Sequence, residues 1–319
     1  MKRGLITWDK AQLPPEALAA RLASLHRHIV DFNVPALVAF TDVWRSNDVR
    51  YISNYMPYWN RALTVVPAGE QPILLCALSP RVYPWIKSVT LHEQIVPSPN
   101  LGVQLLKLCA DRGWTKIGVL DHAGLPNDLY NQLAADPLQI IDMPRNLLRA
   151  ATSDSELVMH RHAAQVARSI LDDCVREVAA DLAGISLTDF GFAGRLERRL
   201  RRAGAEDLFV LISNGRTPPL PAAGHRVDGN SSVTVCLEYN GHWAKLSRNV
   251  AGLTSPLPPA AGATVHRESL AGPYAWVGID ATDSVPGSVI AMQVEMNRDG
   301  IRLYYGETCL QGRENVEVL

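Results

Sequence analysis

The sequence has 319 residues, of which 47% are apolar, and its formal net charge is -1. That length suffices for two domains with separate cores, and the balanced charge argues against a nucleic-acid partner. No apolar run reaches the roughly 20 residues that a membrane span needs, and the polar start is unlike a secretory signal. Five widely spaced cysteines form no metal-binding pattern, which is typical of thiols in a reducing compartment. We therefore expect a globular cytoplasmic protein.

The first 150 residues alternate between helix and strand patterns. Apolar residues at helical spacing predict helices over residues 14–32, 101–114 and 126–134. Short apolar runs predict strands over residues 35–40, 116–121 and 140–143, and a hairpin over residues 62–78. This alternation predicts an α/β domain with a mixed sheet over residues 1–150.

The pattern changes near residue 150, where we place the domain boundary. Thr152 or Ser153 can cap a helix there, and Glu156 stands where a capping box needs it. A long helix then runs to Gly184, a second helix follows over residues 188–205, and strand patterns dominate from residue 207 onward. Residues 151–319 are therefore expected to form a second domain.

A strand-turn-strand segment over residues 233–249 carries the strongest signal of ancestry. The segment reads VTVCLEYNGHWAKLSRN. Through Tyr239, Gly241, Leu246, Ser247 and Arg248 it resembles the corresponding segment of the pita-bread superfamily, which holds methionine aminopeptidases, Xaa-Pro aminopeptidases, prolidases and creatinase. In the metallopeptidases of this superfamily two aspartates of the segment bind the metals.

The two aspartate positions of this segment hold other residues. Matching Gly241 to the family glycine puts Lys245 at the second aspartate and places the first near Thr234. A charged lysine has no lone pair, so it repels a divalent cation. We therefore expect no bound metal, no cofactor and no two-metal hydrolysis.

Three further segments, over residues 49–55, 153–167 and 286–310, resemble superfamily motifs in the same order. The resemblance implies a creatinase-like α/β N-terminal domain followed by an α+β pita-bread domain. That second domain is expected to be shortened, because a helix pair and a histidine-rich segment are missing between Arg248 and Pro286, where His266 is the only histidine.

The last two metal ligands of the superfamily are also altered. The resemblance places one family glutamate on Glu295 and the other on Gly306 or, with a one-residue slip, on Glu307. At most two carboxylates of five ligands then remain. A bridged two-metal site needs several oxygen donors held together, so a residual Xaa-Pro metallopeptidase is the least favoured reading.

Creatinase and ectoine hydrolase show that members of this superfamily can lose the metals and remain enzymes. Creatinase uses a histidine as acid and base, and the resemblance places that position on Ala222, three residues before His225. A re-spacing of this proline-bearing loop could bring His225 into the pocket as the catalytic acid and base, and a solvated loop histidine is the alternative. His242 follows the turn glycine and is a second candidate acid or base. Glu238 and Glu295 are expected to present a pair of carboxylates to a cationic substrate.

The sequence also offers cationic and aromatic candidates for substrate binding. Lys245 and Arg248 could bind substrate, or could instead form internal salt bridges with the glutamates. A desolvated Lys245 could also serve as a base or nucleophile. Trp59 and Arg61 match the residues that creatinase presents to the site of the neighbouring subunit, so the resemblance implies a homodimer with shared sites.

Two functional hypotheses follow. The first is a metal-independent enzyme that cleaves a C–N bond in a small amino-acid-like, guanidino or amide substrate. It predicts an open pocket lined by both glutamates, one of the candidate histidines and Arg61. The second is a non-catalytic protein that binds a peptide, a small molecule or a protein partner. It predicts that Lys245 pairs with glutamates and that the site has no histidine accessible to water.

Overall fold

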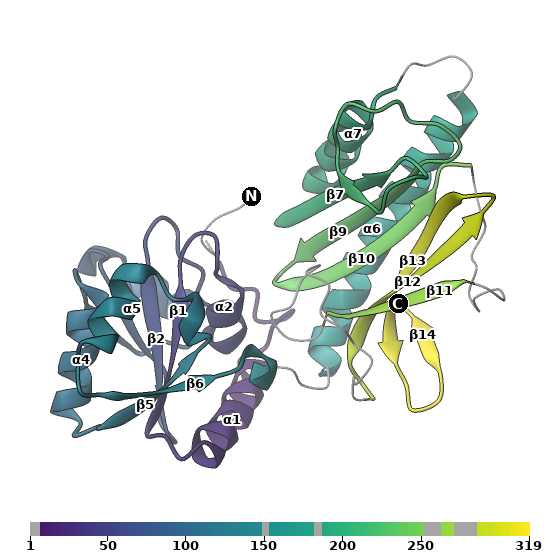
Figure 1. Cartoon of the computed structure of the whole chain (residues 1–319). Coiled ribbons are helices and arrows are strands. Elements are labelled where there is room, and N and C mark those ends of the chain that lie inside the picture. Colours follow the sequence, from purple (N-terminus) through teal and green to yellow (C-terminus); the bar gives the residue numbers. More distant parts are fainter. Residues whose placement is uncertain (1–6, 149–152, 182–186, 252–262, 271–285) are drawn as a thin grey trace. The chain divides into compact units, whose positions relative to one another are not determined.

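The computed structural model describes residues 7–148, 153–181, 187–251, 263–270 and 286–319. The chain divides into two compact units, one over Arg3–Arg149 and one formed mainly by Ala150–Leu319 (Figure 1). Within the described residues, no helix is long and apolar enough to cross a membrane.

The first unit is an α/β domain built on a mixed sheet with the strand order β4-β3-β2-β1-β5-β6. β2 is antiparallel to both of its neighbours, and the other adjacent pairs are parallel. All strands except β2 therefore end at the same edge of the sheet. The elements are α1 (Pro15–Asp31), β1 (Ala36–Thr41), α2 (Asn47–Ser53), β2 (Ala62–Pro67), β3 (Ile73–Cys76), η1 (Pro80–Val82), α3 (Tyr83–Val89), β4 (Gln94–Pro97), α4 (Leu101–Asp111), β5 (Lys116–Leu120), η2 (His122–Gly124), α5 (Asn127–Ala134), β6 (Gln139–Met143) and η3 (Arg145–Leu148).

Both faces of the central strands of this sheet are buried, since β1, β2 and β3 are buried at every position. Successive residues of β1 enter different cores. Leu37 and Ala39 pack in the core that includes residues of α1 and α2, whereas Val38 and Phe40 pack with residues of α4 and α5. The predicted mixed α/β domain is therefore confirmed.

The second unit packs two helices against an eight-stranded antiparallel sheet with the order β11-β12-β13-β10-β9-β7-β8, and β14 also pairs with β13. The capping box is confirmed, because the Ser153 backbone N–H donates to Glu156 Oε2 at 2.9 Å. The elements are α6 (Asp154–Asp181), α7 (Asp189–Arg202), β7 (Asp207–Ser213), β8 (Leu220–Pro221), β9 (Ser232–Tyr239), β10 (His242–Asn249), β11 (Thr264–Ser269), β12 (Val289–Arg298), β13 (Ile301–Gln311) and β14 (Val316–Val318).

The β9–β10 hairpin has its register fixed by a two-residue turn. Asn240 and Gly241 have φ values of 47° and 80°, and positive φ at both positions defines the type I′ turn that Asn-Gly favours. Thr234 consequently lies opposite Ser247, and Lys245 lies opposite Cys236.

The sheet of the second unit has two unlike faces. We call the face that carries Thr234, Lys245 and Ser247 the front face. The opposite face carries Leu246 and Arg248, is covered by α6 and α7 (Figure 1), and is called the helix face. Side chains alternate along a strand, so neighbouring residues fall on opposite faces. The predicted loss of a helix pair concerns residues 252–262 and 271–285, which lie outside the described residues.

The buried His92 ring of the first unit predicts how stability depends on pH. Burial lowers its pKa from 6.5 to about 3. Between these values the unfolded chain takes up a proton at this residue and the folded chain does not. The free energy of unfolding should therefore fall by about 1.4 kcal/mol per pH unit as the pH drops below about 6.5.

Replacing His92 with Gln removes this contribution. We expect a plot of unfolding free energy against pH, measured by urea denaturation, to be flatter for His92→Gln than for the unaltered protein over that range. Equal slopes would contradict the buried neutral imidazole.

Candidate functional site

The position predicted for the first metal-binding aspartate holds a neutral hydrogen-bonded cluster. The Thr234 and Ser247 hydroxyl oxygens lie 2.7 Å apart. The side-chain amide of Gln293, on β12, donates to Ser247 Oγ at 2.8 Å and to Thr234 Oγ1 at 3.3 Å. All three residues are buried. These hydroxyl and amide groups already bond one another, so they form a self-contained polar cluster on the front face.

Gly306 allows this cluster to form. It lies on β13 between Ser247 and Gln293, and it pairs with both. A Cβ atom at Gly306 would lie 3.2 Å from Ser247 Oγ, which is tighter than an ordinary van der Waals contact. The Gln293 amide therefore reaches β10 because the intervening residue has no side chain.

Lys245, at the second aspartate position, forms an ion pair on the same face. Its Nζ lies 2.6 Å from Glu268 Oε2, and the two side chains are 9% and 16% exposed. The pair spans β13 and β12 over two small residues, Thr308 and Ala291. An internal salt bridge was one predicted outcome for Lys245, but its partner is Glu268 and not Glu238 or Glu295.

Cys236 lies opposite Lys245 on the front face. Burial raises the pKa of its thiol to about 12, even though the nearby Lys245 acts in the opposite direction. The thiolate is the nucleophilic form of cysteine. Cys236 is therefore protonated near neutral pH and is unsuited to nucleophilic catalysis.

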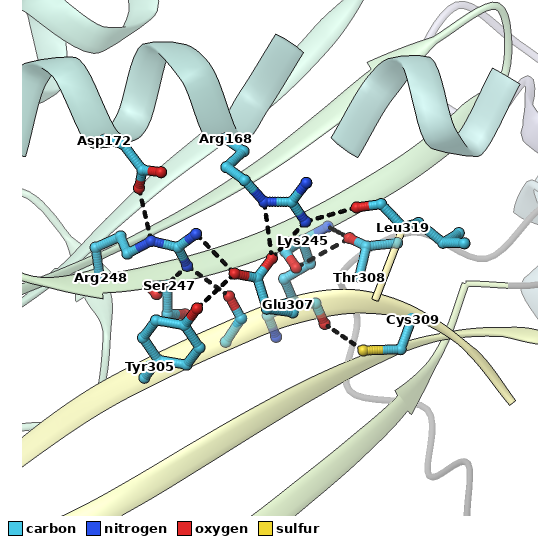
Figure 2. Close-up of polar contacts among 11 residues, drawn as sticks. Arg168, Asp172, Lys245, Ser247, Arg248, Tyr305, Glu307, Thr308, Cys309 and Leu319 are labelled. Atoms are coloured by element: carbon cyan, nitrogen blue, oxygen red, sulfur yellow. Dashed lines mark hydrogen bonds and ion pairs between the residues drawn. The ribbon is translucent and has the colours of Figure 1, made fainter. Parts of the chain in front are cut away.

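Arg248 belongs to a charged network on the helix face, and Figure 2 shows this network around Glu307. The Glu307 carboxylate accepts from Arg248 Nη2 at 2.7 Å, from Arg168 Nη2 at 2.7 Å and from the Tyr305 hydroxyl at 2.6 Å. Arg248 Nε also donates to Asp172 Oδ1 at 2.7 Å. Burial acts to lower the pKa of Arg248, but the surrounding acidic groups outweigh it and raise that pKa.

The network corrects two predictions. Arg248 was a candidate for substrate binding, but its guanidinium is buried and bridges β10, β13 and α6. Glu307 was one alternative for the last metal ligand, but it projects from the face opposite Lys245 and Thr234. Side-chain alternation on β13 therefore excludes Glu307 from the front face.

Glu238 and Glu295 do not form the predicted pair of carboxylates. Glu238 lies opposite Trp243 near the turn of the β9–β10 hairpin. Glu295 lies opposite Tyr304, whose backbone N–H donates to Ser232 Oγ on β9. Ser232 and Glu238 are six residues apart on one strand, or about 20 Å at roughly 3.3 Å per residue. One small substrate cannot contact both carboxylates.

His225 does not enter the front face as predicted. It is exposed in a loop that is bound to the start of α7, a helix on the helix face. The Asp189 backbone N–H donates to the His225 carbonyl at 2.8 Å, and the Asp189 carboxylate accepts from the backbone N–H groups of Ala223 and Gly224. Burial opposes the charge of Asp189, but these backbone donors prevail and lower its pKa.

His242 also lies on the helix face. Its ring is buried, Nδ1 lies 2.8 Å from the Asn240 carbonyl oxygen, and the ring centroid is 5.1 Å from that of His160. Among the described strand residues, the histidine that does lie on the front face is His266, whose Nε2 is 3.3 Å from Glu295 Oε2.

Trp59 and Arg61 lie in the first unit. Arg61 forms a two-point ion pair with Asp128, with both N–O distances at 2.9 Å. Trp59 is 72% exposed and lies beside the exposed Tyr58 ring. Their predicted contribution to the site of a neighbouring subunit stays a prediction.

Sequence reasoning missed Gln293 and Glu268 as front-face residues. The Asn-Gly turn alone could have paired Thr234 with Ser247, because a type I′ turn fixes the register of its hairpin. No comparable local signal marks Glu268, since its contact with Lys245 depends on three strand pairings.

A divalent metal does not suit the donors at the two aspartate positions, which are a bonded hydroxyl cluster and an ion-paired ammonium. In the part of the chain that the structure describes, no three His, Cys, Asp or Glu side chains are grouped so that they could hold a metal ion.

Comparison with known proteins identifies the fold. No protein-family model and no curated protein matches the sequence. An Xaa-Pro dipeptidase from Bacillus anthracis has a TM-score of 0.73 at 15% identity, over 94% of this chain and 97% of the other. A prolidase from Pyrococcus furiosus gives 0.71 at 15% identity, over 93% and 98%. The N-terminal domain of the FACT complex subunit SPT16 from Eremothecium gossypii gives 0.69 at 11%, over 98% and 97%.

These likenesses extend over nearly the full length of each chain. The protein therefore has the two-domain pita-bread fold, as its sequence motifs predicted. At 11–15% identity, what is shared is the fold.

The Lys245–Glu268 pair can be tested by its effect on stability. Glu268→Gln leaves a largely buried ammonium without its carboxylate, so we expect a loss of about 3 kcal/mol in the free energy of unfolding. Adding Lys245→Met to the same chain removes the unpaired charge and should recover part of the loss. If chemical denaturation finds the single and double variants as stable as the unaltered protein, the ion pair is not formed.

The Glu307 network allows a matched comparison of buried and exposed ion pairs. Glu307→Gln removes the carboxylate that two arginines share, at a side chain that is 4% exposed, and should cost about 3 kcal/mol or more. Glu317→Gln removes the exposed pair with Arg161, which is 2.9 Å long, and should cost less than about 1 kcal/mol. Equal losses for the two variants in urea denaturation would contradict the network.

Proposed function

We propose that this protein is a non-catalytic pita-bread protein that binds a peptide or a small amino-acid-like molecule without cleaving it. The observation that carries the proposal is the Lys245–Glu268 ion pair, which stands where the resemblance expects a metal-binding aspartate. An ammonium with its own carboxylate needs no substrate anion for charge balance. The charge of Lys245 is therefore balanced within the protein.

The distribution of the other candidate groups supports this proposal. Glu238 and Glu295 are separated along the sheet, and His225 and His242 lie away from the front face. General acid–base catalysis needs its groups within hydrogen-bond reach of one substrate. The two glutamates and the two histidines are therefore poorly placed to act on one small substrate.

The comparisons suggest which ligands to test first. The similar structures include proteins named as an Xaa-Pro dipeptidase and a prolidase, and a domain of a subunit of the FACT complex. Xaa-Pro dipeptides are therefore suitable first probes, with small guanidino acids as a second set. A protein partner is the further alternative within the same proposal.

A metal-independent hydrolase acting on a C–N bond is the second candidate. It is favoured by the front-face contact of His266 with Glu295, whose other oxygen, Oε1, lies 3.6 Å from Arg302 Nε. A histidine beside a carboxylate is a common acid–base arrangement. This candidate places catalysis at His266 instead of His225 or His242.

The homodimer and the cytoplasmic location are also part of the proposal. The exposed rings of Tyr58 and Trp59 suit a protein interface. All five cysteines are buried and free of disulfides, which suits a reducing compartment.

Binding and turnover distinguish the two candidates. The purified protein would be titrated calorimetrically with Xaa-Pro dipeptides and small guanidino acids, and products would be followed chromatographically with and without added Mn²⁺. We expect saturable binding without product. Cleavage that requires Mn²⁺ would overturn both candidates, because neither uses a metal.

Product formed without metal would favour the second candidate. In that case Glu295→Gln and His266→Ala should each abolish turnover, while the exposed control Glu317→Gln should retain it. Turnover that survives in both site variants would exclude this histidine–glutamate pair as the catalytic group.

A further inference from the structure

A cavity of about 150 Å³ opens at the carboxyl edge of the sheet in the first unit. It is lined by residues that follow three parallel strands: Trp44, Arg45 and Asp48 after β1, Asp121 after β5, and Arg145 after β6. The sheet continues from β1 to β2 on one side and from β5 to β6 on the other. The cavity therefore lies at a topological switch point, where open α/β sheets bind ligands.

The two arginines of this cavity already have acidic or carbonyl partners. Arg145 donates to Asp48 Oδ1 from Nε at 3.2 Å and from Nη2 at 2.9 Å. Arg45 donates to the Gly124 carbonyl, and its Nε lies 3.7 Å from Asp42 Oδ2. Since both guanidinium groups are engaged, the cavity has little free capacity to bind an anion.

The two carboxylates of the cavity, Asp48 and Asp121, are less completely paired with cations. Both Arg145 bonds go to one oxygen of Asp48, and Asp121 makes no ion pair with any described residue. Burial raises the pKa of Asp48 and the nearby Asp121 raises it further, although Arg145 and Arg45 act against both. Arg145 is paired with Asp48 and Arg45 with Asp42, so these described side chains leave the Asp121 carboxylate without a cationic partner.

The backbone holds Asp121 in place for such a role. Its φ of 52° lies in the left-handed region, which asparagine and aspartate tolerate better than most residues. Its carboxylate lies over Gly124, where a Cβ atom would be 2.5 Å from Asp121 Oδ2. The short turn between these two residues therefore depends on a glycine to accommodate the carboxylate.

We propose that this cavity binds a small organic monocation, an amine or a guanidine, between the carboxylates of Asp48 and Asp121. The Trp44 indole, which is 69% exposed and lines the cavity, covers the apolar part of the ligand. An indole face attracts an organic cation as well as apolar groups. The proposal is independent of the function assigned to the second unit.

An organic cation fits this cavity better than a metal ion. A protein site for Mg²⁺ or Ca²⁺ draws on several oxygen ligands, whereas Asp121 is the one carboxylate lining this cavity that has no cationic partner among the described residues. An alkylammonium or guanidinium carries its charge on N–H donors and needs only one or two carboxylate acceptors.

The test is calorimetric titration of the full-length protein with n-butylammonium and n-butylguanidinium, and with n-butanol as a neutral control. We expect saturable binding of the two cations and none of n-butanol. Asp121→Asn should weaken binding by roughly tenfold or more, because a charge-assisted hydrogen bond is lost. Asp111→Asn, at an exposed pair with Lys107 on α4, should leave the affinity unchanged.

Trp44→Ala provides a second variant on an exposed side chain, so folding should be retained, and it should weaken binding of n-butylguanidinium several-fold. Circular dichroism would check the fold of each variant. The proposal is overturned if neither cation binds, if n-butanol binds equally well, if Asp121→Asn keeps the original affinity, or if Mg²⁺ binds the cavity more tightly than either organic cation.

Discussion

The register of the β9–β10 hairpin is the constraint on which the second unit depends. The Asn240-Gly241 turn sets it, and it places Thr234 opposite Ser247 with Lys245 on the same face. A shift of one residue in either strand would move its whole set of side chains to the other face. The neutral cluster and the ion pair would then lose their positions together. A local turn of two residues thus determines which side chains of β9 and β10 lie on the front face.

The alternation of side chains along each strand places a buried cation and a buried anion on opposite faces of the sheet. The front face neutralises Lys245 with a carboxylate from a distant strand, whereas the helix face surrounds Glu307 with two arginines and a tyrosine hydroxyl. Burying Glu307 requires such partners, because a buried carboxylate without them is strongly unfavourable. The network therefore fastens α6 to β10 and β13. The front face carries the neutral Thr234–Ser247–Gln293 cluster and the Lys245–Glu268 ion pair, whose polar groups bond one another.

The sequence predicts much of the fold and part of the site. Helical spacing, the capping box at Ser153 and the order of the motifs all lead to the observed architecture. The cation at Lys245 is also evident from the motif. The partners are not, because a motif gives the position of a residue on its own strand and not the register between β12, β13 and β10. Glu307 and Gly306 differ by one position, and alternation alone assigns them to opposite faces. The prediction that His225 enters the pocket is wrong for another reason, since backbone hydrogen bonds to Asp189 hold its loop at the start of α7.

Gly306 has a consequence for how this protein can change. The resemblance places a metal-binding glutamate at this position, yet a side chain there would displace the Gln293 amide from Ser247. Restoring that glutamate alone would put a negative charge among hydroxyls, and restoring an aspartate at Lys245 alone would leave Glu268 beside another anion. Each of these single substitutions is unfavourable until the others have been made. A set of carboxylate ligands on the front face is therefore hard to introduce into this sequence by one substitution at a time.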